Sequence, residues 1–191
     1  MAWQDVVTPV VIASITSVGL TWVKEFFREK REKKSTAIQK AIILALQLEK
    51  FSIECSFYIQ DLDIYNRHCY DELIDISKRS HDSLPNLGVS LGNDTYKEIK
   101  TEYVSQIANL LIELQISQAS IKDAFDVDID IGIKELLIQA GVLGYKAWNL
   151  SKKLRKEYNL LPLELENLGY NPIEEYLIPQ YQEQIKKEKQ Q

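Results

Sequence analysis

An acidic run near the middle of the chain has the alternating carboxylates of a calcium-binding loop. The run reads Asp126-Val127-Asp128-Ile129-Asp130-Ile131-Gly132. An EF-hand loop requires Gly at its sixth position and a bidentate Glu at its twelfth, whereas this chain has Ile131 and Leu137 there. We therefore interpret the run as an acidic loop between two helices, and we expect its last carboxylate, Asp130, to cap the second helix.

The thiols and imidazoles do not form a recognisable site. The chain has two Cys and two His, at Cys55 and in the pairs His68-Cys69 and His81-Asp82. Neither pair has the ligand spacing of a zinc site, and a Cys on an apolar helical periodicity is ordinarily a packed thiol. Glycine-rich phosphate loops, the G-x-S-x-G elbow and H-E-x-x-H are absent from the sequence. We expect reduced, buried thiols, with no catalytic residue, no metal and no cofactor.

Five cations stand within eleven positions towards the C-terminal end, near Tyr145, Trp148 and Tyr158. They are Lys146, Lys152, Lys153, Arg155 and Lys156. The helix dipole favours cations at the C-terminal end of a helix, so a solvated face is the simpler interpretation. The alternative is a site for an anionic ligand such as a nucleotide or oligonucleotide, whose bases could stack on the aromatic rings.

The first part of the chain contains 18 consecutive uncharged residues, at positions 6–23. A helix of that length measures roughly 27 Å, close to the thickness of the hydrocarbon core of a bilayer. Trp3 and Trp22 near its two ends suit interfacial anchoring. The pattern predicts a transmembrane helix. Because several Ser and Thr lower its hydropathy, a helix of a soluble protein buried in a partner or an oligomer core stays open as an alternative.

One face of the predicted transmembrane helix is polar, within about 60° on a helical wheel. The candidate pore-lining residues on this stripe and its extension are Val10, Ser14, Ser17, Thr21, Lys24 and Arg28. Hydroxyl groups gain nothing from facing lipid, so the stripe predicts contact with other helices or with water. Close packing through small residues and the lining of a pore both fit, and both require several copies of the chain.

A basic collar follows the uncharged segment, whereas Asp5 is the one charged side chain before it. The collar contains Lys24, Arg28, Lys30, Arg31, Lys33 and Lys34. The positive-inside rule then places the N-terminus outside a bacterial inner membrane and the rest of the chain in the cytoplasm. We divide the chain into the predicted span with its collar (1–34), a cytoplasmic helical bundle (35–179) and a polar tail (180–191).

Behind the collar, apolar residues recur at alternating steps of four and three. This seam contains Ala37, Ala41, Leu44, Leu48, Phe51, Cys55, Tyr58, Leu62, Tyr65 and Cys69. Its spacing predicts a long helix that reaches about residue 79 and packs as in a left-handed coiled coil. A second stripe widens the face that we expect to be buried, and it contains Ile38, Ile42, Ile53, Phe57 and Ile64.

The remaining sequence predicts two more long helices, so the expected fold class is all-α. Residues 80–93 read as a loop, and Thr95 with Glu98 has the spacing of a capping box that opens the next helix. The apolar face of that helix contains Ile99, Tyr103, Ile107, Leu110, Leu114 and Ile121. We expect a break over residues 123–132 and a third helix over about 133–158, in which Gly141 and Gly144 allow another helix to approach closely.

The uncharged segment at 6–23, the basic collar and the helical body together resemble the small single-span membrane effectors of bacterial antiphage defence. Hailong-type channel subunits are one such type. The resemblance covers the whole chain as architecture. It implies a channel restrained by its cytoplasmic domain and, for the Hailong type, an oligonucleotide ligand that holds the channel shut.

The leading hypothesis is a homo-oligomeric membrane protein whose transmembrane helices form an ion-conducting pore gated by the cytoplasmic bundle. The alternative is a membrane-tethered scaffold or sensor that binds a regulatory protein and conducts no ions. The net charge of −5 excludes a generally basic nucleic-acid binder. We expect no enzymatic activity.

Overall fold

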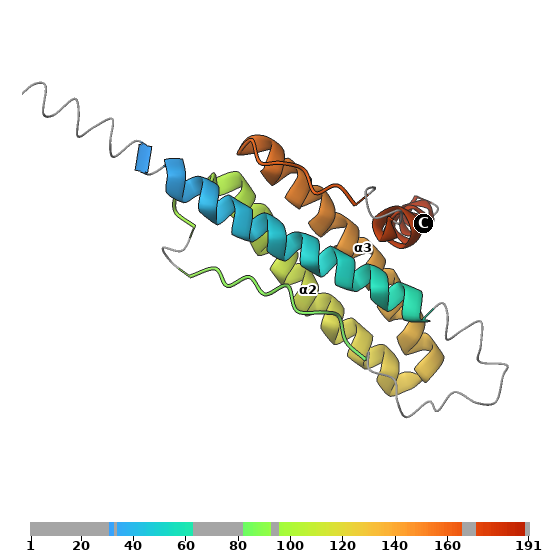
Figure 1. Cartoon of the computed structure of the whole chain (residues 1–191). Coiled ribbons are helices and arrows are strands. Elements are labelled where there is room, and N and C mark those ends of the chain that lie inside the picture. Colours follow the sequence, from blue (N-terminus) through green and yellow to red (C-terminus); the bar gives the residue numbers. More distant parts are fainter. Residues whose placement is uncertain (1–30, 33, 63–81, 93–95, 166–170, 190–191) are drawn as a thin grey trace, which may run out of the picture.

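Three long helices lie side by side in the computed structural model of the chain (Figure 1). The structure describes residues 31–32, 34–62, 82–92, 96–165 and 171–189. The long helices are helix 34–62, α2 (Thr101–Val127) and α3 (Ile129–Glu157), and a short π-helix, η3 (Ile173–Leu177), leads into α4 (Ile178–Glu188). Over these ranges the secondary structure is helical without a strand, which confirms the predicted all-α class for the part described.

The predicted seam forms the core of the bundle. From Ala37 to Leu62 its members are buried, except that Tyr58 is half-buried, and its last two members lie outside the described residues. The predicted apolar face of α2 is buried as well, and it meets the seam in one continuous core. The seam therefore closes the core of a single chain.

The second stripe is less buried than predicted, since Ile42 and Phe57 are exposed and Ile53 is half-buried. The neighbours of helix 34–62 explain the difference. On one flank Ser52 contacts α3, and on the other flank the Gln47 side chain donates to the carbonyl of Gly88 at 2.8 Å. Both flanking contacts lie beside the seam, and the opposite face of the helix stays open to solvent.

Helices α2 and α3 form an antiparallel hairpin with a single residue between them, so the predicted break over 123–132 is wrong. Asp128 Oδ1 accepts hydrogen bonds from the backbone N–H groups of Asp130 and Ile131 at 2.8 and 3.3 Å and caps α3, the role that we expected of Asp130. The absent side chain of Gly132 leaves room for the ring of Phe125, which allows this tight connection.

The predicted capping box is also wrong, because α2 begins at Thr101 and has no side-chain cap. Glu98 instead pairs with Lys40 of helix 34–62 at 2.5 Å, and this hydrogen bond lowers the pKa of Glu98. Thr95 lies outside the described residues. A contact across 58 residues of sequence thus replaces a local cap.

The C-terminal region packs against α3. Ile173 and Leu177 are buried in the core, and the rings of Tyr145 and Tyr181 lie 4.4 Å apart between centroids. Helix α4 includes residues of the stretch expected to be a polar tail. The boundaries of the three predicted regions stay predictions.

Candidate functional site

The five cations of the predicted anionic-ligand site lie on different sides of α3. Lys146 forms an ion pair with Glu113 of α2 at 2.8 Å, and the ammonium group of Lys152 lies 5.8 Å from the centroid of the Trp148 ring. Lys153 and Lys156 are exposed. The structure therefore does not gather the five side chains into one patch.

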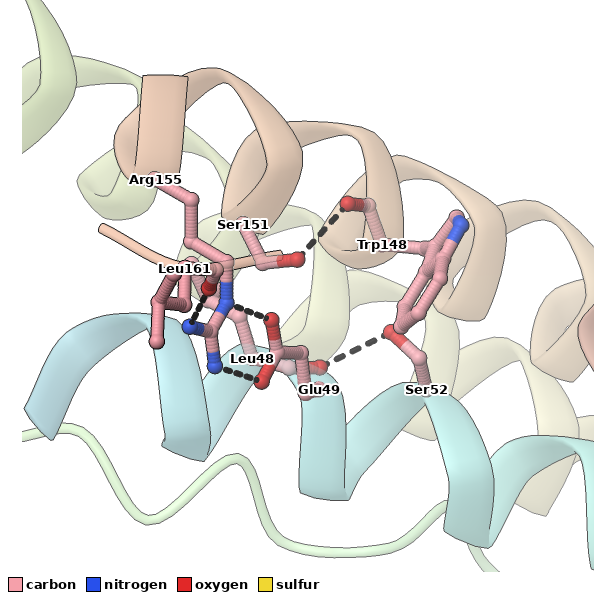
Figure 2. Close-up of polar contacts among 7 residues, drawn as sticks. All are labelled: Leu48, Glu49, Ser52, Trp148, Ser151, Arg155 and Leu161. Atoms are coloured by element: carbon pink, nitrogen blue, oxygen red, sulfur yellow. Dashed lines mark hydrogen bonds and ion pairs between the residues drawn. The ribbon is translucent and has the colours of Figure 1, made fainter. Parts of the chain in front are cut away.

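Arg155 points inward and clamps helix 34–62 to α3 (Figure 2). Its Nε and Nη2 atoms donate to the two carboxylate oxygens of Glu49 at 2.5 and 2.7 Å, and Nη1 donates to the carbonyl of Leu161. The two side chains are 14% and 3% exposed. The hydrogen-bonded carboxylate raises the pKa of Arg155. Arg155 is one of the five predicted anionic-ligand residues, and its charge is satisfied within the fold.

Sequence reasoning missed Glu49, although the sequence contains a signal for it. Glu49, Ser52 and Ser56 follow one another at steps of three and four, and all three are buried. Ser52 Oγ donates to the carbonyl of Leu48 at 2.8 Å (Figure 2). The same hydroxyl group lies 2.9 Å from the carbonyl of Gly144 on α3. Polar residues at helical spacing beside an apolar seam thus indicate the side on which α3 packs.

Gly144 lies where helix 34–62, α3 and η3 meet. A Cβ atom at this position would lie 2.8 Å from Cys55 Cβ and 3.0 Å from a methyl group of Leu177. Gly141, one turn earlier, lies against Gln180 of α4 in the same way. The prediction that these two glycines allow close approach of another helix is confirmed.

Gly144→Ala should destabilise the bundle by about 1–3 kcal/mol through overpacking, although Ala in a helix is intrinsically better than Gly by about 1 kcal/mol. The added methyl group meets Cys55 Cβ, which is fixed to the backbone and has no rotamer to escape. Urea unfolding of the full chain in mild detergent measures the change. Lys156→Ala, exposed on the same helix, is the control and should shift stability by less than about 0.5 kcal/mol. A Gly144→Ala variant at least as stable as the parent would contradict the tight contact.

Cys55 is not suited to be a nucleophile. It is fully buried, and burial raises the pKa of its thiol well above the usual value, with a smaller contribution from the carboxylate of Glu54. A protonated, inaccessible thiol packs as a small apolar group. His68, Cys69 and His81 lie outside the described residues. Within the part described, no group of three His, Cys, Asp or Glu side chains is placed to hold a metal ion.

Two clefts border α3 on either side of Tyr145 and Asn149. The first has a volume of about 340 Å³ and lies between α2, α3 and α4; its polar lining includes Asn109, Glu113, Lys146, Asn149 and Lys153. The second, of about 360 Å³, is lined by Trp148 and Lys152 and by the carboxylates of Glu164 and Glu174. Because its cations outnumber its carboxylates, the first cleft is the better fit for an anion.

The candidate pore-lining residues, Val10, Ser14, Ser17, Thr21, Lys24 and Arg28, lie outside the described residues. In the part of the chain that the structure covers, no helix is both long enough and apolar enough to cross a membrane. The pore and its lining stay a prediction from sequence.

Comparison of the chain with protein-family models, with curated proteins and with solved structures found no match.

Proposed function

We propose that the chain is a homo-oligomeric membrane protein whose segment 6–23 spans the bilayer and lines an ion-conducting pore, with the helical bundle as its gate. The sequence supports the span through its 18 uncharged residues and the basic collar behind them. It supports the pore through the polar stripe that includes Ser14 and Ser17. The architecture resembles that of antiphage effectors, which suggests that the pore opens in response to infection and makes the membrane leaky.

The observation that carries the proposal is the firm attachment of helix 34–62 to α3. This helix follows the collar directly, and its seam is buried along the bundle. The Glu49–Arg155 pair and the contact of Ser52 with Gly144 hold it against α3. A displacement of α3 therefore moves helix 34–62, and with it the residues that lead towards the predicted span.

The proposed control point is the first cleft, where an anionic ligand would contact α2, α3 and α4 at once. Lys153 contributes an exposed cation there, and Asn109 and Asn149 contribute amide groups that recognise polar edges. The Tyr145–Tyr181 ring pair borders the same cleft. Binding in the first cleft would change the packing of α4 against α3. Because α3 holds helix 34–62, the change would be transmitted through α3 to that helix.

A second candidate function is a membrane-tethered scaffold that binds a regulatory protein. It is favoured by Ile112 and Ile116, which lie one turn apart on α2 and are 55% and 64% exposed. Such a scaffold would conduct no ions.

A flux assay separates the two functions. We expect the full chain, reconstituted in liposomes, to release a trapped ion, and a short anionic oligonucleotide to change the rate of release. Liposomes that contain the chain but stay tight with and without the oligonucleotide would overturn the pore and leave the scaffold.

The proposed orientation makes a separate prediction about accessibility. In a Cys69→Ser background, Gln4→Cys should react with a membrane-impermeant maleimide on intact cells, whereas Ser83→Cys, at an exposed position, should react only after lysis. The reason is the basic collar behind the span and the absence of basic residues before it. Labelling in the reverse order would contradict the orientation.

A further inference from the structure

Helix 34–62 has a second apolar face that the bundle leaves uncovered. Its members are Ile43, Leu46, Ile53 and Phe57, with Lys50 in their midst. Ile43, Leu46 and Phe57 are 52%, 51% and 45% exposed, and Ile53 is half-buried. At roughly 100° per residue, the five positions fall within about 80° of one another and are centred about 180° from the buried Leu48. We call this face the outer stripe.

The outer stripe has the spacing of a coiled-coil seam. The steps between its members are three, four, three and four residues, so they occupy successive a and d positions, with Lys50 at an a position. A single polar residue at a is a known device for fixing register and oligomer number. The ammonium group of Lys50 also lies 3.6 Å from a carboxylate oxygen of Glu54 on the same helix, which partly neutralises the charge of Lys50 within the outer stripe.

We propose that a second copy of this chain docks along the outer stripe, with the two helices parallel and in register. The inference rests on the proposed function. If segments 6–23 of several copies span one membrane in the same orientation, the copies of helix 34–62 that follow them lie side by side and run parallel. The chain before residue 31 leads directly into the helix that has the stripe. Identical stripes on parallel helices then meet member to member.

The size of the stripe indicates how strong the docking is. It extends over roughly 22 Å of helix and exposes on the order of 400 Å² of apolar surface, within the range of the largest patch on a monomer. A stable complex in solution buries roughly 800 Å² per partner. The stripe alone therefore gives weak association, and confinement of the copies in one membrane supplies the effective concentration that completes it.

Self-crosslinking of single-cysteine variants in native membranes tests the docking. The background is Cys69→Ser, with Cys55 retained because its buried, protonated thiol does not react. In a parallel pair, Leu46→Cys and Ile53→Cys each meet their own counterpart, and an oxidant should link most of the chain into dimers. Lys122→Cys, exposed on α2, should stay monomeric. Crosslinking at Lys50→Cys without crosslinking at Leu46→Cys would show an antiparallel pair and overturn the parallel arrangement. Absence of crosslinking at Leu46→Cys, Lys50→Cys and Ile53→Cys would overturn the docking.

A disruptive substitution gives an independent readout that does not depend on cysteine reactivity. Leu46→Glu should reduce energy transfer between copies labelled with donor and acceptor by several-fold, while the helical circular dichroism of the bundle stays unchanged because the side chain is half exposed. Ile116→Glu, which changes an exposed apolar residue on α2, is the matched control and should leave energy transfer intact. Equal loss in both variants, or in neither, would contradict the outer stripe.

The same samples show which proposal fails. Each is fractionated, and the share of chain in the membrane pellet is measured alongside the dimer. A membrane-bound chain without dimer overturns the docking alone. A chain found in the soluble fraction overturns the proposed function, whatever the crosslinking result.

Discussion

Glu49→Ala should lower the free energy of unfolding by about 3 kcal/mol, because it leaves a largely buried guanidinium without its carboxylate partner. Arg155 is 14% exposed, and the carbonyl of Leu161 is then its remaining acceptor. A loss of this size is a large share of the 5–15 kcal/mol that typically stabilises a domain. Urea titration of the full chain in mild detergent, followed by circular dichroism at a wavelength for helix, measures it.

The control is a solvent-exposed ion pair that also joins two helices. Glu113→Ala breaks the pair with Lys146, whose side chains are 43% and 44% exposed, and should cost less than about 1 kcal/mol. Replacing both members of the buried pair, Glu49→Leu with Arg155→Leu, should recover most of the stability because no charge is left buried. Equal losses for Glu49→Ala and Glu113→Ala would show that burial does not set the strength of the clamp.

Ser14→Leu combined with Ser17→Leu should abolish ion flux through liposomes while the chain remains inserted. Leu favours insertion more than Ser does, so a loss of flux cannot come from failed targeting. The substitutions would replace the hydroxyl groups of the predicted pore lining with apolar side chains, and hydrophobic constrictions block ions by dewetting. The flux of the trapped ion, normalised to the inserted protein, is the readout.

Thr8→Leu with Thr16→Leu is the matched control, since it also removes two hydroxyl groups. On the wheel of the predicted helix, these positions lie more than about 100° from Ser14, so flux should persist. Loss of flux in both double variants, or in neither, would contradict a pore lined by the Ser14–Ser17 stripe.

Local periodicity was sufficient to predict most of the bundle. The seam from Ala37 to Leu62 and the apolar face of α2 are buried as expected. A helix in a bundle must bury one apolar stripe, and the residues of that stripe recur every three or four positions, so the sequence of the helix alone identifies them. The same reasoning located Gly141 and Gly144, since a residue without a side chain in an apolar helix usually marks a close contact.

Two of the features that sequence reasoning missed depend on contacts between residues far apart in sequence, and a third depends on the packing of one side chain. Glu98 has the spacing of a local cap, but Lys40 binds it across 58 positions. Glu49 and Arg155 are 106 positions apart, and no local pattern pairs them. The acidic run around Asp128 resembled a long break because Asp is a poor helix former, whereas packing of Phe125 over Gly132 keeps both helices intact to within one residue.

The predicted ligand site shows a different limit of reasoning from sequence. Its five cations were grouped by their closeness in sequence, but at roughly 100° per residue Lys146 and Arg155 point to opposite sides of a helix. The structure agrees, with Lys146 on the α2 side and Arg155 on the side of helix 34–62. A helical wheel drawn for these residues separates Arg155 from Lys146 and Lys153 but leaves Lys152 about 60° away from it, so burial of Arg155 becomes visible only in the structure.

Alkaline carbonate extraction tests the membrane proposal most directly. Membranes from cells that express the full chain are washed at high pH, which removes peripheral proteins and leaves integral ones in the pellet. We expect the full chain in the pellet and a variant that lacks residues 1–23 in the supernatant. Recovery of the full chain in the supernatant would contradict a membrane-spanning segment, and with it the pore.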